Sequence, residues 1–339
     1  MVDTRNIVLF TCFVLILGCK GQRDPSFPIS KSSFRPILRT AISVPKGRSV
    51  SLDDIIIRHF SSNSSDSTAY RIKAITRLLS DPSFDPRRPT VLYAHGYIEL
   101  TEDDSVLTIV KAYRQNGRYN ILILDWSNLA FGSYVLVALD LKPAAVEISN
   151  ALVKLLKEGL NVKGLHFVGH SLGVHLLGAV ARNLSTRGYV VPRLTGLDAA
   201  YPGFYPPILS TPASPSDASF VDMVHTDGGG YGAPQSCGHV DFWPNGGTAK
   251  QPGCLPATLL LTSEDLCSHW WSWEFWSEAV AGEQFLGRKC QSYDSFLRGQ
   301  CTNTQLATLG PSIDVRLRGN FYLRTAAQRP YSLGVRGID

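Results

Sequence analysis

The sequence predicts an α/β fold in which a mainly parallel central sheet carries helices on both faces. Short runs of β-branched and other apolar residues alternate along the chain with helical patterns. These runs are continuously apolar, as expected of strands that are buried on both sides. The 339 residues, 44% of them hydrophobic and 18% charged, are enough for one large core. In such a sheet, ligands bind beyond the carboxyl ends of the strands.

Six apolar runs and one long helical pattern support this prediction. The predicted strands span residues 55–60, 90–94, 120–124, 165–168, 194–197 and 220–224. The longest helical pattern spans residues 143–159, where Gly159 is placed to end the helix. Its predicted core face consists of Val146, Ser149, Val153 and Leu156.

The N-terminus has the pattern of a cleavable signal peptide. Residues 7–18 form an apolar run that is short for a bilayer span, with Arg5 before it and Cys19 after it. We therefore expect a secreted protein, and an uncleaved signal anchor is the alternative. The expected organisation is a signal peptide over residues 1–21, an N-terminal extension over 22–50, a main domain over 51–330 and a C-terminal tail over 331–339.

Five of the seven cysteines lie in the body of the chain: Cys237, Cys254, Cys267, Cys290 and Cys301. In a secreted chain, disulfides are the default state of such cysteines. Two glycosylation sequons, at Asn63 and Asn183, fall in polar and loop-like surroundings. Both features agree with an extracellular location.

The net charge of +5 is small, and the charged residues are scattered along the chain. The sequence has no dense block of Lys and Arg and no basic stripe interleaved with aromatic residues. Nucleic acid is therefore not an expected partner. A weak attraction to anionic lipid surfaces is compatible with this charge.

The pentapeptide Gly169-His170-Ser171-Leu172-Gly173 lies between the predicted strand at 165–168 and a helical pattern. A serine on a sharp strand-to-helix turn needs small neighbours, so that its hydroxyl stands clear of the sheet edge. Gly169 and Gly173 meet that need. The context predicts Ser171 as a nucleophile, and an ordinary serine between two turn glycines is the alternative.

A serine nucleophile needs a base that takes its proton and a carboxylate that orients the base. In this class of sheet the acid follows the serine and the histidine follows the acid. Asp198 is the best acid by position, because it ends the run at 194–197, and a solvated turn aspartate is the alternative. Three histidines follow, and spacing alone does not choose among His225, His239 and His269.

Further motifs occur in a fixed order along the chain. They are Ala94-His95-Gly96-Tyr97, Leu124-Asp125-Trp126, Thr195-Gly196-Leu197-Asp198, His225-Thr226-Asp227-Gly228, Gly238-His239-Val240-Asp241 and Cys267-Ser268-His269. With the serine pentapeptide they resemble the pancreatic lipase family of secreted animal α/β-hydrolases, over residues 55–325. The resemblance implies the α/β-hydrolase fold, with Ser171 as nucleophile, Asp198 as orienting acid and His269 as general base. It leaves His225 and His239 structural.

Two backbone N–H groups are expected to stabilise the oxyanion of the tetrahedral intermediate. The N–H of Leu172, just after the nucleophile, is one, and the resemblance implies the N–H of Tyr97 as the other. Gly96 lets the backbone of that loop approach closely. His95 is expected to be structural.

The same resemblance implies disulfides between Cys254 and Cys267 and between Cys290 and Cys301. It leaves Cys237 unassigned, with Cys19 as a candidate partner. The first pair matches the ends of the family's lid, which here runs over residues 255–266, from Leu255 to Leu266. A second covering loop, residues 229–237, is also short.

A short lid with a short second loop resembles the A1-type phospholipases of this family and the insect-type lipases. The physical reason is that less apolar cover leaves a more open site, which accepts a bulky polar headgroup beside one acyl chain. The expected function is therefore a phospholipase A1 that releases the acyl chain at the first glycerol position. A triacylglycerol lipase or galactolipase with a shortened lid is the first alternative, and an inactive yolk-type storage or lipid-carrier protein is the second.

The family's calcium site is half lost, because Ser214 replaces one acidic ligand while Asp217 persists. No cofactor and no bound metal are therefore predicted. The matching segments end near residues 319–323, with the family's catalytic domain, so neither a C-terminal β-sandwich nor a colipase-like partner is expected. The expected partner is lipid at a membrane, micelle or lipoprotein surface.

Overall fold

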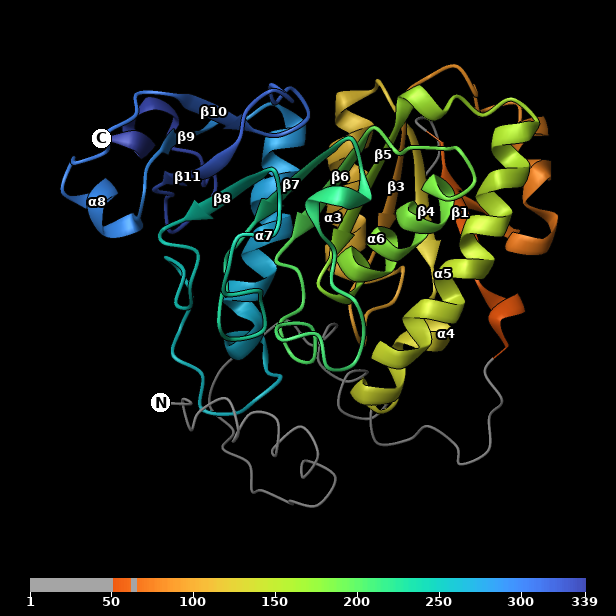
Figure 1. The fold of residues 1–339 in the computed structure, drawn as a ribbon, viewed down its shortest axis with the longest axis horizontal. Helices are drawn as coiled ribbons and strands as arrows, with labels where there is room; N and C mark the ends of the chain where they lie inside the picture. Colours follow the sequence, from red (N-terminus) through yellow and green to blue (C-terminus); the bar gives the residue numbers. More distant parts are fainter. Residues whose placement is uncertain (1–50, 62–65) are drawn as a thin grey trace.

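The computed structural model describes residues 51–61 and 66–339, and the strands of these residues form one sheet. The strands are β1 (Ile56–Phe60), β2 (Ser67–Arg71), β3 (Thr90–Ala94), β4 (Asn120–Asp125), β5 (Leu165–His170), β6 (Arg193–Leu197), β7 (Phe220–Val224), β8 (Val240–Pro244), β9 (Phe285–Lys289), β10 (Leu306–Leu309) and β11 (Gly319–Leu323). Their order is β10-β9-β11-β8-β7-β6-β5-β3-β4-β1-β2 (Figure 1). From β4 across to β11 every neighbouring pair is parallel, and the outer pairs are antiparallel. The predicted α/β fold with a mainly parallel sheet is confirmed.

All six predicted strands are present. Strands β3 and β7 have the predicted bounds, and the other four differ by one or two residues at one end. The remaining strands were not predicted, and most of them lie near an edge of the sheet. β2, for example, is mostly exposed and carries no apolar run that would mark it as a strand.

Helices cover both faces of the sheet. They are α3 (Asp104–Asn116), α4 (Ser127–Ala130), α5 (Tyr134–Lys157), α6 (Leu172–Ser185), α7 (Ser263–Ala281) and α8 (Tyr293–Leu297), with 3-10 helices η1 (Leu52–Asp54), η2 (Ile72–Ser80), η3 (Val162–Gly164), η4 (Pro215–Asp217) and η5 (Gly334–Ile338). α5 packs on α6 and α3 packs on α7. Strand β3 contributes to a core on each face, because Leu92 and Ala94 join the α5–α6 core while Val91 and Tyr93 join the α3–α7 core.

The helix predicted over residues 143–159 is longer than expected. α5 begins at Tyr134, so Pro143 lies inside it rather than at its start. A proline in a helix interior removes one backbone hydrogen bond, and here packing against α6 maintains the helix on both sides of it. The predicted core face is also partly wrong: Ser149 is buried, but Val146 is 37% exposed.

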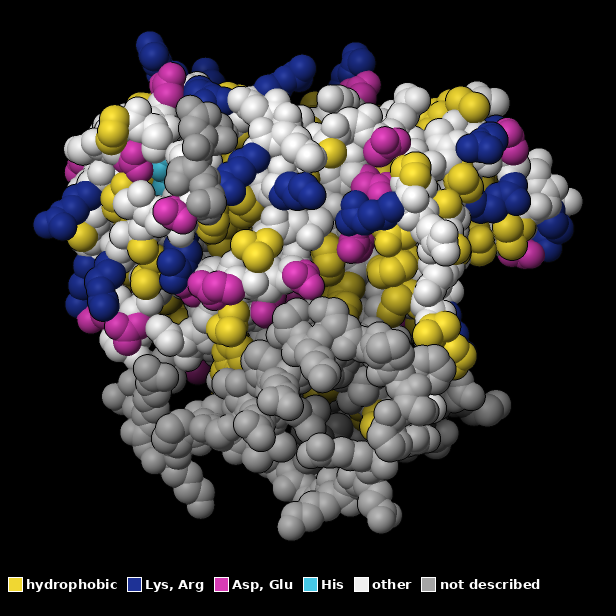
Figure 2. All heavy atoms as spheres, turned by 180° about the vertical axis from the view of Figure 1, so that it is seen from behind, with side chains coloured by type: hydrophobic (Ala, Val, Ile, Leu, Met, Phe, Trp, Pro, Cys, Tyr) yellow, Lys and Arg dark blue, Asp and Glu magenta, His cyan; other side chains and the backbone are white. Residues whose placement is uncertain are grey.

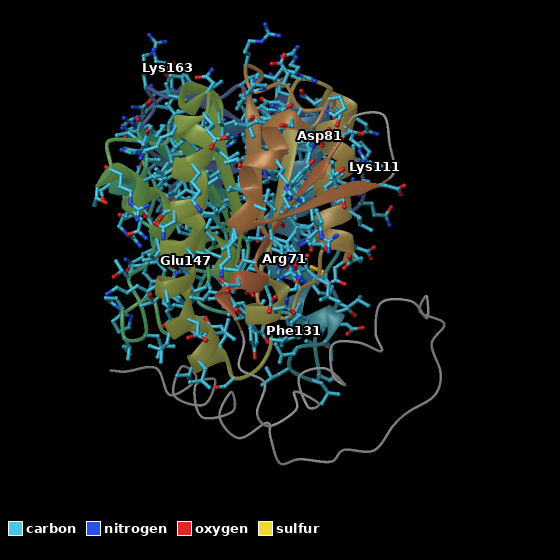
Figure 3. All side chains as sticks on the ribbon, turned by 90° about the vertical axis from the view of Figure 1, so that its right-hand side faces the viewer. Arg71, Asp81, Lys111, Phe131, Glu147 and Lys163 are labelled. Carbon is cyan, nitrogen blue, oxygen red and sulfur yellow. A yellow bond between two sulfur atoms is a disulfide. The ribbon has the colours of Figure 1, made fainter. Side chains whose placement is uncertain are left out.

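The carboxyl ends of the parallel strands lie at one edge of the sheet, where the candidate site residues follow them. Figure 3 shows Phe131, shortly after β4, at this edge, and Lys163, just before β5, at the opposite edge. The C-terminal tail at 331–339 packs against the main domain. The N–H of Tyr331 donates to Glu278 Oε2 at 2.8 Å, and that of Arg324 donates to the carbonyl of Gly337 at 2.7 Å.

Three features predicted from the sequence, the signal peptide, Cys19 and the sequon at Asn63, lie outside the described residues. Asn183 does not lie in a loop: it is half-buried near the C-terminal end of α6, whose apolar face packs into the core. No helix in the described part of the chain is long and apolar enough to cross a membrane. Figure 2 shows one face, on which Lys and Arg are scattered among Asp and Glu.

Candidate active site

Ser171 lies on a sharp turn between β5 and α6, with φ of 53° and ψ of −121°. The turn imposes this conformation, which is rare for a residue other than glycine. A Cβ on Gly169 would lie 2.6 Å from the backbone of Gly173, and a Cβ on Gly173 would lie 2.3 Å from the carbonyl oxygen of Ala94. Only glycine therefore fits on either side of Ser171. The predicted strand-turn-helix context is present.

Asp198 follows β6 and is completely buried. Its Oδ2 lies 2.6 Å from Nδ1 of His269. Its Oδ1 accepts hydrogen bonds from the backbone N–H groups of Thr226 at 2.8 Å and Asp227 at 3.1 Å. These bonds orient the carboxylate toward the histidine, so Asp198 is not a solvated turn residue.

His269 lies nearly two turns into α7, because this helix begins at Ser263, with Thr262 as its N-cap. Burial lowers the pKa of His269 below its ordinary value, while the hydrogen bond to Asp198 opposes this shift. No hydrogen bond joins the Ser171 hydroxyl to His269 among the described residues. Catalytic contacts of this kind often tighten only when substrate binds.

The other two candidate histidines have different partners. Nε2 of His225 lies 2.8 Å from Asp241 Oδ1, and its ring stacks on Trp243 with centroids 3.8 Å apart. Nδ1 of His239 accepts a hydrogen bond from the N–H of Val221 at 3.0 Å. Neither ring bonds to Asp198, so the structure brings only one of the three histidines to the candidate acid.

The two expected oxyanion donors come from different elements. Leu172 begins α6, and Tyr97 lies in the loop after β3. Neither N–H forms a hydrogen bond within the described residues. The loop is held in place nearby, because the N–H of Ile98 donates to the carbonyl of Ala130 at 3.0 Å and the Tyr97 hydroxyl donates to the carbonyl of Gly132. The His95 ring stacks on Trp126, and its nitrogens lie near the carbonyl of Gly96 and the hydroxyl of Ser127.

The predicted disulfides Cys254–Cys267 and Cys290–Cys301 are both present. Cys237 is buried and has no disulfide partner among the described residues. Burial raises the pKa of its thiol.

The lid is only partly a loop, because the residues from Ser263 onward belong to α7. Its free part is tied to the second covering loop through Asp265. The N–H of Leu261 donates to Asp265 Oδ2 at 2.8 Å, and the hydroxyl of Tyr231 donates to the same oxygen. The Tyr231 ring also lies 5.8 Å from the His269 ring. Both covering loops are thus fixed beside the site, while Leu255 and Leu259 remain 68% and 70% exposed.

Of the residues at the family's calcium site, Asp217 bonds to other groups of the chain. Nη1 of Arg182 donates to its two carboxylate oxygens at 2.7 and 2.8 Å, and the N–H of Ser214 donates to Oδ2 at 2.9 Å. The same guanidinium donates to the carbonyls of Thr211 and Pro212. The positive charge of Arg182 therefore stands where a calcium ion would bind the Asp217 carboxylate, so Asp217 and Ser214 do not form a site that fits calcium.

Three residues near the site were missed by sequence analysis: Glu99, Asp227 and Tyr231. Glu99 precedes the acidic stretch at 102–104, which resembles the solvated start of a helix. Asp227 is buried beside Asp198. Burial is the larger cause and the negative charge of Asp198 the second that raise the pKa of Asp227 to about 8. The sequence offered one signal for each of two of these residues. Glu99 stands three residues after Gly96, and Asp227 directly follows Thr226 in one of the matching motifs.

The family model described as Lipase matches residues 32–331. Pancreatic lipase-related protein 2 of Myocastor coypus is 33% identical over 239 residues, which are 65% of this chain and 50% of that protein. Pancreatic triacylglycerol lipase of Cavia porcellus is 31% identical over 261 residues, which are 70% of this chain and 55% of that protein. The chain thus spans about half the length of these curated relatives. A solved phospholipase/carboxylesterase from Dyadobacter fermentans is 12% identical, covers 41% of this chain and 66% of that chain, and has a TM-score of 0.30, which adds nothing to the topology above.

Proposed function

Because this chain belongs to the pancreatic lipase family, we propose that it hydrolyses lipid carboxylic esters with Ser171, Asp198 and His269 as its catalytic triad. The observation that carries the proposal is the 2.6 Å contact between the buried Asp198 carboxylate and Nδ1 of His269, beside a serine on a strained strand-to-helix turn. An ordinary core serine needs no such turn.

The reaction has two half-reactions. Nε2 of His269 takes the proton of the Ser171 hydroxyl while Oγ attacks the ester carbonyl carbon, and the N–H groups of Leu172 and Tyr97 stabilise the resulting oxyanion. Asp198 stabilises the imidazolium, which then gives its proton to the leaving alcohol oxygen as the C–O bond breaks. In the second half-reaction water attacks the acyl-enzyme with the same assistance, the fatty acid leaves, and Ser171 regains its proton.

A phospholipase A1 is the specific activity that we propose. It is supported by the covering loops, because twelve residues separate Cys254 from Cys267 and the Asp265 contacts fix the short lid to the second loop. A lid held in this way does not cover the site as a long mobile lid does. The site is then open to a substrate with a polar headgroup, and its activity should depend little on an oil surface.

We also propose that the protein is secreted and works at a lipid surface. The two disulfides support secretion, since such bonds persist in oxidising compartments. The exposed Leu255 and Leu259 support contact with lipid, because apolar side chains that stand out beside a site favour an interface.

The decisive experiment gives the secreted protein three substrates: phosphatidylcholine, triacylglycerol and a galactolipid, each with distinguishable acyl chains. Release of only the first-position chain from phosphatidylcholine is the expected result. Release from triacylglycerol or the galactolipid alone would establish the corresponding alternative in its place. No release from any substrate would support the storage or carrier function. The Ser171→Ala variant is the matched control, and any release that it retains does not come from the triad.

A further inference from the structure

Glu99 lies in the loop after β3 that also carries Tyr97, and its side chain is only 12% exposed. Its Oε2 accepts the backbone N–H of Gly96 and lies 3.2 Å from Nδ1 of His170. His170 is the residue directly before Ser171. A single carboxylate oxygen therefore joins the loop of one expected oxyanion donor to the turn that carries the nucleophile.

The loop needs such a contact because its backbone is strained. Ile98 has φ of +58°, which is unfavourable for a β-branched residue and persists only where neighbouring contacts impose it. The bond from Gly96 to Glu99 closes the turn on one side, and the bond from Ile98 to Ala130 holds the other. Gly96 also lies very close to the nucleophile, since a Cβ added there would be 3.0 Å from Cβ of Ser171. A small shift of this loop would therefore move the Tyr97 N–H relative to the substrate carbonyl.

His170 connects Glu99 to the proposed general base. Its ring lies 4.6 Å from the ring of His269, measured between centroids, at an angle of 43°. Its Nε2 is buried and has no hydrogen-bond partner among the described residues. The other groups that face His269 are Asp198, which bonds to it, the carboxyl of Asp227 and the ring of Tyr231.

We propose that Glu99 is a positioning residue for the ester hydrolysis proposed above. Its carboxylate fixes the oxyanion loop against the nucleophile turn through Gly96 and His170, and its negative charge stabilises the protonated form of His269 that arises during each half-reaction. This role rests on the proposed function, and it adds Glu99 as a fourth side chain that supports the triad.

The charges around Glu99 agree with this role. Burial alone would raise the pKa of Glu99, but the charge and hydrogen bond of His170, the charge of His95 and the N–H of Gly96 outweigh it and lower the pKa to about 2. These contacts therefore favour the ionised form of Glu99. Its charge opposes the lowering of the His269 pKa, which burial and the charge of His170 produce. Asp103 and the hydroxyl of Tyr93 are the remaining titratable groups that respond to Glu99.

Two variants separate the two effects. In Glu99→Gln the amide oxygen can still accept the Gly96 N–H, but the charge is gone, whereas Glu99→Ala removes both. With p-nitrophenyl butyrate as a soluble ester, we expect kcat to fall about tenfold in Glu99→Gln and about a hundredfold in Glu99→Ala, with KM within about twofold of the wild type. Glu102→Gln is the matched control, since this exposed glutamate lies in the same loop and accepts a hydrogen bond from the Thr101 hydroxyl.

A second readout does not depend on turnover. The pKa of His269, followed by NMR of its imidazole carbon proton and assigned with His269→Ala, should be lower in Glu99→Gln than in the wild type and unchanged in Glu102→Gln. Wild-type kcat in both Glu99 variants, or an unchanged His269 pKa in Glu99→Gln, would overturn the proposal. If the wild type hydrolyses no ester, the proposed function fails, and the His269 pKa still decides whether Glu99 acts on that histidine.

Discussion

Asp198 and His269 are 71 positions apart in the chain, and Oδ2 of the first lies 2.6 Å from Nδ1 of the second. Sheet order and helix packing produce this contact. Asp198 stands at the carboxyl end of β6, and α7, which carries His269, packs against that strand. The other carboxylate oxygen is held by the backbone after β7. The Asp198 carboxylate is therefore held toward His269 by the fold itself.

The pairing of His269 with Asp198 predicts a clear difference between two histidine variants. His269→Ala should lower kcat by a factor on the order of 10⁴ or more with the fold intact, because the base is lost. His225→Ala should instead lower the free energy of unfolding by about 3 kcal/mol, because it removes a buried ring that bonds to Asp241 and stacks on Trp243. Ester hydrolysis and urea unfolding of both variants test this. Full activity in His269→Ala with a pure loss of turnover in His225→Ala would identify His225 as the base.

The lowered pKa of His269 predicts the acid side of the pH profile. Burial is the main cause of the lowering, and the bond to Asp198 only partly offsets it. The base must be neutral to accept the proton of Ser171, so kcat/KM should stay high as the pH falls through 6.5 and decline only below it. Measurement of kcat/KM on a soluble ester between about pH 4 and pH 9 tests this. An inflection above pH 6.5 would contradict the direction of the shift.

Asp227 predicts a pH-dependent stability. Its pKa is raised from 3.8 to about 8, first by burial and then by the charge of Asp198. As the pH rises from about 4 to about 8, the unfolded chain loses this proton before the folded chain does, so Asp227 makes the protein less stable across that window. Asp227→Asn should therefore gain unfolding free energy relative to the wild type, and the gain should be larger at pH 8 than at pH 5. Urea unfolding at pH 5 and pH 8 measures it, with the exposed Asp104→Asn as control. Equal differences at the two pH values would contradict the prediction.

The hydrogen bond from the Tyr231 hydroxyl to Asp265 is expected to restrain the lid. Tyr231→Phe removes the hydroxyl that donates to Asp265 but keeps the ring beside His269. A hydrogen bond to a charged group contributes about 2 kcal/mol, so the free part of the lid should open more often. Limited proteolysis should then cut within residues 255–262 faster than in the wild type. Tyr201→Phe is the control, since the same change there leaves the lid contacts intact. Equal cleavage rates in all three proteins would show that the hydroxyl does not restrain the lid.

The bonds of Arg182 to Asp217 predict that calcium is not needed for stability at this site. EDTA should leave the melting temperature and the ester hydrolysis of the wild type unchanged. Arg182→Met should lower the free energy of unfolding by about 3 kcal/mol, because Asp217 is fully buried and would lose its cation. Thermal unfolding with and without EDTA and calcium checks both statements. A melting temperature of the wild type that falls in EDTA and recovers with calcium would contradict them.

Local patterns explain which parts of the fold could be predicted. The strands at 90–94 and 220–224 were predicted with their observed bounds because both consist mainly of apolar residues, as strands buried on both sides do, and Asp222 is the one charged exception. Edge strands such as β2 carry no such run. The start of α5 was missed because Pro143 resembles the first turn of a helix, and only packing against α6 shows that the helix continues through it.

The sequence by itself predicted the turn at Ser171, because Gly169 lies against the backbone of Gly173, only four residues further on. The requirement for Gly173 is tertiary, since a Cβ there would meet the carbonyl oxygen of Ala94 at the end of β3. Apart from the family resemblance, it left three histidines open as the partner of Asp198 and did not indicate Glu99. The tertiary structure decided both. The contact between Asp198 and His269 depends on how α7 packs against β6. The contact between Glu99 and His170 depends on the pairing of β3 with β5 in the sheet. No local pattern of side chains encodes distances between segments that are 71 residues apart.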